Sequence, residues 1–281
     1  MKKNRIFILF IVLCLLCTSC NKTKNLNNNS TKEDIPEEIE YSGINGTADT
    51  IMGKTVIISI YANDTVTKWN NDTDNTKIND TLNNLKIATD YLVKQVNSYN
   101  KEALFIYDWN KFDDIKYIAN FDTDIVNNYK DNYDTQREWI VNNIDIGNIK
   151  KKYAADNLVF MYFFNTDDTN TSITSTYNRL DIDIIDVFPV NSNYTIPPAT
   201  YAHELLHTFG APDLYYANEI INQEYVDYLI EIDSNDIMAK VNYGDEIINE
   251  FSNLDAYYVG LIDESSDVTK WNLGLSEHIL K

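Results

Sequence analysis

From about residue 54 onward, the hydrophobic and polar positions alternate between strand-like and helix-like spacing. Runs of β-branched or aromatic residues predict strands, and apolar residues at steps of three and four predict helices. The predicted strands cover 54–61, 104–107, 158–164 and 180–187, and the predicted helices cover 77–99 and 134–156. The second helix is expected to start at an N-cap, Asp134, and to break near Gly147. Because strands and helices alternate, we expect the fold class α/β (α+β).

Two of the predicted strands differ in their surroundings. The run 158–164 is apolar at every position, which indicates a central strand buried on both faces. From Leu180 onward, apolar residues alternate with Asp181 and Asp183, which predicts a half-buried strand with one face in water.

The first twenty residues have the pattern of a bacterial export signal. A basic start precedes an apolar run over 6–17, which is too short to span a bilayer. The small residues before Cys20 resemble the lipobox at which bacterial lipoproteins are cleaved and acylated on the cysteine. We therefore expect a lipoprotein signal peptide over 1–19 and a lipid on Cys20, which would hold the protein outside the cytoplasm at the membrane surface. Secretion after cleavage near Ser19 is the alternative.

The leader is followed by a polar stretch and then by the folded part of the chain. Residues 20–50 contain few large apolar side chains, which favours a flexible tether. Residues 51–281 form the expected globular domain. All three cysteines lie at or before Cys20, so the exported chain can form no internal disulfide.

The chain is strongly acidic. Its 281 residues include 43 Asp and Glu against 23 Lys and Arg, for a net charge of −20. Such a charge repels phosphate groups, so we expect no binding to nucleic acid. A hydrophobic content of 44% excludes a wholly disordered chain. No internal repeat is present, and a monomer is expected.

The most specific chemical signal lies between His203 and His207. Four residues apart on a helix, the two imidazoles project from one face and can bind the same ion. Glu204 is offset by one residue, where its carboxylate can reach a water beside the ion without binding the ion itself. Pro197 and Pro198 suit the start of this helix, and Gly210 suits the residue after its end.

With Gly210 and Asp213, this motif resembles the extended zinc signature of the metzincin metallopeptidases, in the variant whose third ligand is Asp. The segment Gly-Ala-Pro-Asp-Leu-Tyr is similar to that of immune-inhibitor-A-like peptidases and, more distantly, of the snapalysin group. The resemblance implies Zn²⁺ held by His203, His207 and Asp213. It also implies that Gly210 turns the chain sharply back toward the metal. A thermolysin-like site with Glu250 as the third ligand is the runner-up.

The resemblance also implies two lobes around a cleft. The upper lobe, 51–210, would contain a twisted mixed sheet, two long helices and the zinc helix at the cleft. The lower lobe, 211–281, would be small and mostly helical or irregular. Within it, the segment 250–262 resembles the C-terminal helix of these peptidases.

Two further site residues follow from the resemblance. Met238, in Ser-Asn-Asp-Ile-Met-Ala, is the candidate for the Met-turn beneath the metal. Several metzincins place a Tyr two residues after this Met as a transition-state donor. Here that position is Lys240, so Tyr243 becomes the candidate donor.

The implied function is zinc-dependent endopeptidase activity on extracellular proteins, with Glu204 as general base. We expect the peptide substrate to add as an antiparallel strand along an edge strand near 180–187. Acidic residues on that strand, Asp181, Asp183 and Asp186, favour neutral or basic substrates. The alternative is that these acids only form a solvated face and serve solubility.

Several alternatives stay open at this point. One is a surface lipoprotein whose metzincin-like domain binds a protein without cleaving it, and another is a zinc hydrolase of a non-peptide amide. The acidic stretches 71–75 and 122–124 are weaker candidates for Ca²⁺, since neither has the Gly and the terminal Glu of an EF-hand loop.

Overall fold

The computed structural model describes residues 46–280, apart from 71, 129–131, 179 and 192–193. The predicted signal peptide, Cys20 and the tether up to residue 45 therefore lie outside the described residues. All the described residues belong to one compact unit. In this described part, no helix is long and apolar enough to cross a membrane.

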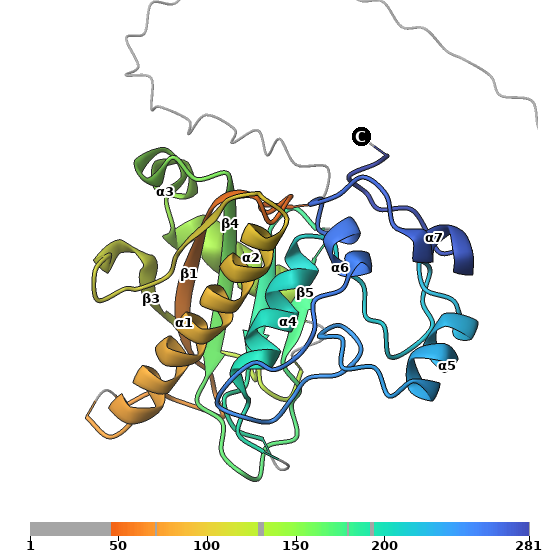
Figure 1. The fold of residues 1–281 in the computed structure, drawn as a ribbon. Coiled ribbons are helices and arrows are strands. Elements are labelled where there is room, and N and C mark those ends of the chain that lie inside the picture. The colour runs from red at the N-terminus through yellow and green to blue at the C-terminus, as the bar shows by residue number, and fades with distance from the viewer. Residues whose placement is uncertain (1–45, 71, 129–131, 179, 192–193, 281) are drawn as a thin grey trace, which may run out of the picture. The chain divides into compact units, whose positions relative to one another are not determined.

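A six-stranded sheet forms the centre of the fold (Figure 1). Its strands are β1 (Gly53–Asn63), β2 (Ala103–Ile106), β3 (Lys116–Asn120), β4 (Asn157–Phe164), β5 (Ser175–Tyr177) and β6 (Ile184–Val187). The order is β2-β1-β4-β6-β5, and β3 pairs with the second half of β1. All pairs are parallel except that between β5 and β6, so the sheet is mixed, as expected. β4 is buried at every position and is central, as its continuous apolar run predicts.

Helices pack against the sheet, and after the last strand the chain continues mainly in helices. They are α1 (Asn75–Ser98), the 3₁₀ turn η1 (Asp113–Ile115), α2 (Tyr133–Asn143), α3 (Ile146–Tyr153), α4 (Pro198–Thr208), α5 (Gln223–Glu231), α6 (Asn253–Tyr258) and α7 (Ser266–Trp271). α1 and α4 lie side by side against one face of the sheet (Figure 1). α1 buries the apolar stripe that its sequence predicts, including Ile78, Leu85 and Leu92.

The predicted helix 77–99 and the strands predicted at 54–61, 104–107 and 158–164 are confirmed. The second predicted helix is divided into α2 and α3, because Asp145 caps α3 by accepting a hydrogen bond from the Asn148 N–H at 2.9 Å. The prediction of Asp134 as N-cap is wrong. Asn132 occupies that position, and Asp134 lies in the first turn.

The prediction of an edge strand near 180–187 is also wrong. Only Ile184–Val187 form a strand, β6, and it lies between β4 and β5. The edge is β5, whose three residues are each half-buried. A polar strand of this length has too few residues for its alternation to be recognised from sequence.

Asp183 and Asp186 are buried and do not form a wet face. Asp183 Oδ2 accepts a hydrogen bond from the Ala48 N–H at 2.8 Å, and Asp186 Oδ1 accepts one from Gln136 Nε2 at 2.6 Å. Burial raises the pKa of each carboxyl to about 8. These two acids therefore cannot select a substrate by surface charge.

The end of the predicted tether is bound to the sheet. Gly46 has a φ of 108°, and a Cβ on it would lie 2.3 Å from Asp183 Oδ2. The Thr47 carbonyl oxygen accepts a hydrogen bond from the Leu158 N–H at 2.9 Å, and Ala48 is buried. The predicted boundary at residue 50 is thus too late, because the described fold already includes Gly46.

From Ala211 on, the described residues form three short helices joined by irregular segments, beside α4 (Figure 1). No strand occurs in this described segment apart from an isolated bridge between Asp236 and Glu250. This arrangement agrees with the expectation of a mostly helical or irregular segment over 211–281. The predicted helix within 250–262 is present as α6.

Candidate metal centre and active site

α4 carries two candidate ligands and the candidate base. Pro198 occupies its first turn, where a missing N–H costs little. After the helix ends, Gly210 adopts a φ of 100°, and its N–H donates to the His207 carbonyl oxygen at 3.0 Å. A Cβ on Gly210 would lie 3.0 Å from the Tyr258 carbonyl oxygen, so both conformation and space favour glycine. The predicted helix and its glycine end are confirmed.

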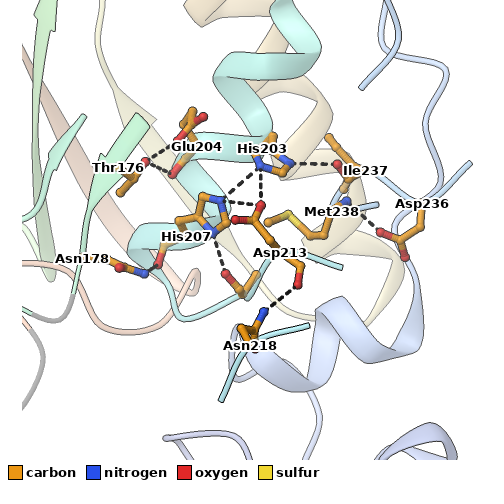
Figure 2. A network of polar contacts seen from close by, with 11 residues as sticks. Thr176, Asn178, His203, Glu204, His207, Asp213, Asn218, Asp236, Ile237 and Met238 are labelled. Atoms are coloured by element: carbon orange, nitrogen blue, oxygen red, sulfur yellow. Dashed lines mark hydrogen bonds and ion pairs between the residues drawn. The ribbon is translucent and has the colours of Figure 1, made fainter. Parts of the chain in front are cut away.

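The structure brings His203, His207 and Asp213 together (Figure 2). The two Nε2 atoms lie 3.1 Å apart, and Asp213 Oδ1 lies 3.1 Å from His203 Nε2 and 3.3 Å from His207 Nε2. A tetrahedral zinc ion with bonds of about 2.0–2.1 Å separates its ligand atoms by about 3.3 Å. The three ligand atoms therefore have the spacing that a zinc ion requires.

Backbone carbonyls fix the orientation of both imidazoles. His203 Nδ1 lies 2.9 Å from the Ile237 carbonyl oxygen, and His207 Nδ1 lies 2.7 Å from that of Ala211. A carbonyl oxygen can only accept, so each Nδ1 carries a hydrogen and donates it. In the neutral imidazoles, both Nε2 atoms then present lone pairs toward Asp213, as a metal site needs.

The donor set has the chemistry of a cation site. Asp213 Oδ1 is buried, and the two imidazole nitrogens that it faces can donate to it only when they are protonated and are acceptors when neutral. Acceptors at this distance repel one another unless a cation or a proton lies among them. Elsewhere in the described part of the chain, no three His, Cys, Asp or Glu side chains lie close enough to hold an ion. The group thus fits a divalent metal.

His207 and Asp213 shift each other's pKa values in opposite directions. Burial disfavours the charged form of His207, but the hydrogen bond to Asp213 and the charges of Glu204 and Asp213 outweigh it and raise the pKa of His207 to about 9. Burial likewise opposes ionisation of Asp213, yet the neighbouring imidazoles hold the pKa of its carboxyl well below the usual range. A metal ion therefore competes with a proton for this group, and metal binding weakens in acid.

Glu204 is held beside the ligands by β5 (Figure 2). Thr176 Oγ1 donates to Glu204 Oε2 at 2.7 Å and lies 3.1 Å from the Glu204 carbonyl oxygen. Burial raises the pKa of the Glu204 carboxyl, although both nearby histidines lower it. A buried carboxyl with a raised pKa, next to a candidate metal group, is suited to accept and return a proton.

Met238 lies in a tight turn next to the ligands. Its side chain is fully buried, and its carbonyl oxygen accepts a hydrogen bond from the Leu214 N–H at 3.0 Å. Asp236 Oδ1 accepts a hydrogen bond from the Met238 N–H at 2.7 Å and so fixes the turn (Figure 2). The residue between them, Ile237, supplies the carbonyl that orients His203.

A buried pair of carboxyl groups supports this turn from α6. Asp236 and Asp255 hydrogen-bond to each other, and each is at most 5% exposed. Asp255 also completes a capping box with Ser252 at the start of α6. Burial, followed by the charge of Asp236, raises the pKa of Asp255 well above its usual range, and burial also raises that of Asp236. The two carboxyls therefore resist being ionised together.

The ligand group opens into a cavity of about 630 Å³. Its walls come from the β5 segment, from α4 and from the turn that follows Gly210. Tyr215 and Tyr216 line this cavity, and the ring of Tyr215 stacks on that of His203 with a centroid distance of 6.3 Å. After burial, the charge of Asp213 is the next cause that raises the pKa of both tyrosines, so their hydroxyls lie close to its carboxylate.

Thr176, Tyr215 and Asp255 were not predicted as site residues. Thr176 and Asp255 lie in segments distant in sequence from the ligands, so no local pattern reveals their contacts. Tyr215 could have been predicted, because it lies only two residues after Asp213 in the motif segment itself.

Other sequence candidates lie apart from the ligand group. Tyr243 is 69% exposed, does not line the cavity, and packs its ring against Tyr194 with a centroid distance of 4.8 Å. Glu250, the runner-up ligand, is exposed and joins the turn through its backbone. Asp74 and Asp124, from the two calcium candidates, accept hydrogen bonds from nearby asparagines. Residue 71 of the first stretch lies outside the described residues.

Comparison of the chain with models of protein families, with curated proteins and with solved structures found no match.

Removal of a ligand should abolish metal binding. We expect His207→Ala and Asp213→Ala to lose the stoichiometric zinc that the unaltered protein binds, because each leaves only two ligand atoms. Saturating zinc, at about 100 times its Kd, should stabilise the unaltered protein by about 2.7 kcal/mol and leave these variants unchanged. Elemental analysis after dialysis and thermal unfolding provide the measurements.

His278→Gln is the matched control, since His278 lies outside the ligand group and bonds to the Phe209 carbonyl oxygen. Loss of zinc in this control as well would contradict the assignment.

The carboxyl pair should make the free energy of unfolding fall as the pH rises. Both pKa values are raised in the folded state, so the stabilisation is complete below the carboxyl pKa of the unfolded chain, about 4, and is lost progressively as the pH rises from there toward the folded values. We expect the free energy of unfolding to fall by about 1.4 kcal/mol per pH unit for each proton lost. Asp255→Asn, which can donate without a titrating proton, should flatten this decline, whereas the exposed Asp263→Asn should not. Urea unfolding across a pH series tests this, and an identical slope in Asp255→Asn would rule out the role of this pair.

Proposed function

We propose that the protein is a zinc-dependent endopeptidase of metzincin type. The observation that carries the proposal is the convergence of His203, His207 and Asp213 to within 4.8 Å, with Glu204 beside them, at the wall of an open cavity. A structural zinc site would be closed by a fourth protein ligand, whereas three ligands facing a cavity leave room for water and substrate. A general base beside such a group has a use in hydrolysis, whereas a binding module has no need of one.

His203, His207 and Asp213 would hold the zinc ion. When bound, the ion polarises the carbonyl of the scissile peptide and lowers the pKa of a water molecule. Glu204 accepts the proton of that water as its oxygen forms a bond to the carbonyl carbon. When the C–N bond breaks, Glu204 returns the proton to the amine nitrogen. Thr176 keeps the Glu204 carboxylate in place through its 2.7 Å hydrogen bond.

The substrate would pair with β5 and not with residues 180–187. β5 is the last strand of the described sheet, antiparallel to its one neighbour, and its residues 175–177 line the cavity. An extended peptide that adds to this edge gains backbone hydrogen bonds and passes the ligand group. Because Thr176 lies in β5, the strand that binds the peptide also holds the base.

We further propose that Cys20 carries a lipid and that the enzyme acts on proteins outside the cytoplasm. The lipobox-like residues before Cys20 support this placement. The described fold begins by Gly46, which leaves about 25 residues as a tether, enough to span several tens of ångströms.

Loss of the base should abolish cleavage and keep the metal. We expect Glu204→Ala to cut peptides at least about 1,000-fold more slowly than the unaltered protein while it binds zinc in full, because Glu204 touches the water and not the ion. A complex peptide library incubated with both proteins and analysed by mass spectrometry gives the rates and the cleavage sites. Equal cleavage by the variant would overturn the role of Glu204, and no cleavage by either zinc-loaded protein would favour the non-proteolytic alternatives.

Tyr215 is better placed than Tyr243 to donate a hydrogen bond to the developing oxyanion. Tyr215 lines the cavity next to Asp213, whereas Tyr243 packs on Tyr194. We expect Tyr215→Phe to lower kcat by about 10- to 100-fold with unchanged zinc content, and Tyr243→Phe to leave kcat nearly unaltered. Steady-state kinetics on one cleaved peptide compares the two variants. A reduced kcat in Tyr243→Phe alone would return the role to the residue that the sequence suggests.

A further inference from the structure

We propose that Glu219 gives the cavity a preference for peptides that carry a basic side chain near the cleaved bond, among apolar or aromatic neighbours. This inference rests on the proposed endopeptidase function and names the substrate class of the same site.

The apolar part of the preference follows from the cavity walls. Ile173, Tyr215 and Tyr216 line the cavity and are 63%, 54% and 49% exposed. Ile220 also lines the cavity. Large apolar side chains that gather around one cavity and stay open to water mark a binding surface for apolar groups. Aromatic or aliphatic peptide side chains would cover them.

The preference for a basic side chain follows from the charged residues of the same cavity. Its acidic lining residues are Glu204, Asp213 and Glu219, and no Lys or Arg is among the described residues that line it. A divalent ion balances the charges of Glu204 and Asp213. Glu219 is then the charge that remains, and it attracts a Lys or Arg side chain and repels an acidic one.

The backbone that carries Glu219 is fixed on both sides. The Asn218 side chain accepts hydrogen bonds from the Ile220 and Ile221 N–H groups at 2.9 Å each. Its amide donates to the Asp213 carbonyl oxygen at 3.0 Å (Figure 2). On the other side, the Gly274 N–H donates to the Ile220 carbonyl oxygen at 2.8 Å. The backbone that carries Glu219 is therefore tied to the segment of the candidate ligand Asp213, which keeps this acidic residue at the cavity.

The acids that the sequence suggested for this selection cannot perform it. Asp183 and Asp186 are buried, and Asp181 is paired with Arg137. The preference for basic substrates thus belongs to Glu219, which lies in the segment that follows the candidate ligand Asp213 and lines the cavity.

The test uses short labelled peptides in which Tyr alternates with Lys, with Gln or with Glu. We expect the purified zinc-loaded protein to cleave them with kcat/KM in the order Lys, Gln, Glu. In Glu219→Gln the ratio of Lys to Gln peptide should fall by about 3- to 5-fold, as for an exposed ion pair, and Glu219→Lys should reverse the order. Added salt should reduce the ratio in the unaltered protein. Glu231→Gln removes one exposed charge outside the cavity and is the matched control, which should keep the original order.

Binding separates this inference from the proposed function. Fluorescence anisotropy with the zinc-loaded Glu204→Ala protein measures the affinity for the same peptides without cleavage. If Glu219→Gln in that background weakens only the Lys peptide, the preference stands even where the unaltered protein cleaves nothing. Cleavage of all three peptides at equal rates, or a Lys preference that persists in Glu219→Lys, would overturn the role of Glu219 and leave the endopeptidase function intact.

Discussion

At Gly210 the chain leaves the helix that holds both imidazoles with a φ of 100°, and the geometry of the site depends on this turn. An L-residue rarely adopts such a φ, and a Cβ there would press on the Tyr258 carbonyl oxygen. The turn reverses the chain, so Asp213 faces His203 and His207 within three residues. A straight continuation of α4 would place residue 213 about one and a half turns further along the helix, far from both histidines.

The ligands are also tied to the C-terminal segment. His203 donates to the carbonyl of Ile237, and the turn around Ile237 is supported by the carboxyl pair of Asp236 and Asp255. The orientation of His203 and the packing of α6 are therefore linked, since a shift of the turn would rotate this imidazole. The pair has a cost, because two buried carboxyls must retain a proton. In return, the carbonyl that orients His203 is held from a helix nearly twenty residues away in sequence.

Much of this arrangement was predictable from sequence, and the errors have clear physical causes. The periodic stripe of α1, the continuous apolar run of β4 and the spacing of His203, His207 and Asp213 are local signals, and the structure agrees with them. β5 is polar and has only three residues, so its pattern is indistinct. Asp183 looked solvent-exposed because its partner, the Ala48 N–H, is 135 residues away. Burial that depends on such distant partners cannot be predicted from the local pattern of residues.

The position of β5 at the edge of the sheet restricts the conformation of what can be cleaved. A chain can pair with β5 only when its own backbone is extended and its hydrogen-bonding groups are free, whereas helices and inner strands of folded proteins have theirs occupied. Under the proposed function, a folded target must first open locally at the segment to be cut. The rate of attack then reflects how often that segment unfolds as well as its amino acids. Natively unfolded segments, exposed loops and damaged proteins would be cut first, and intact domains would be spared by their own stability.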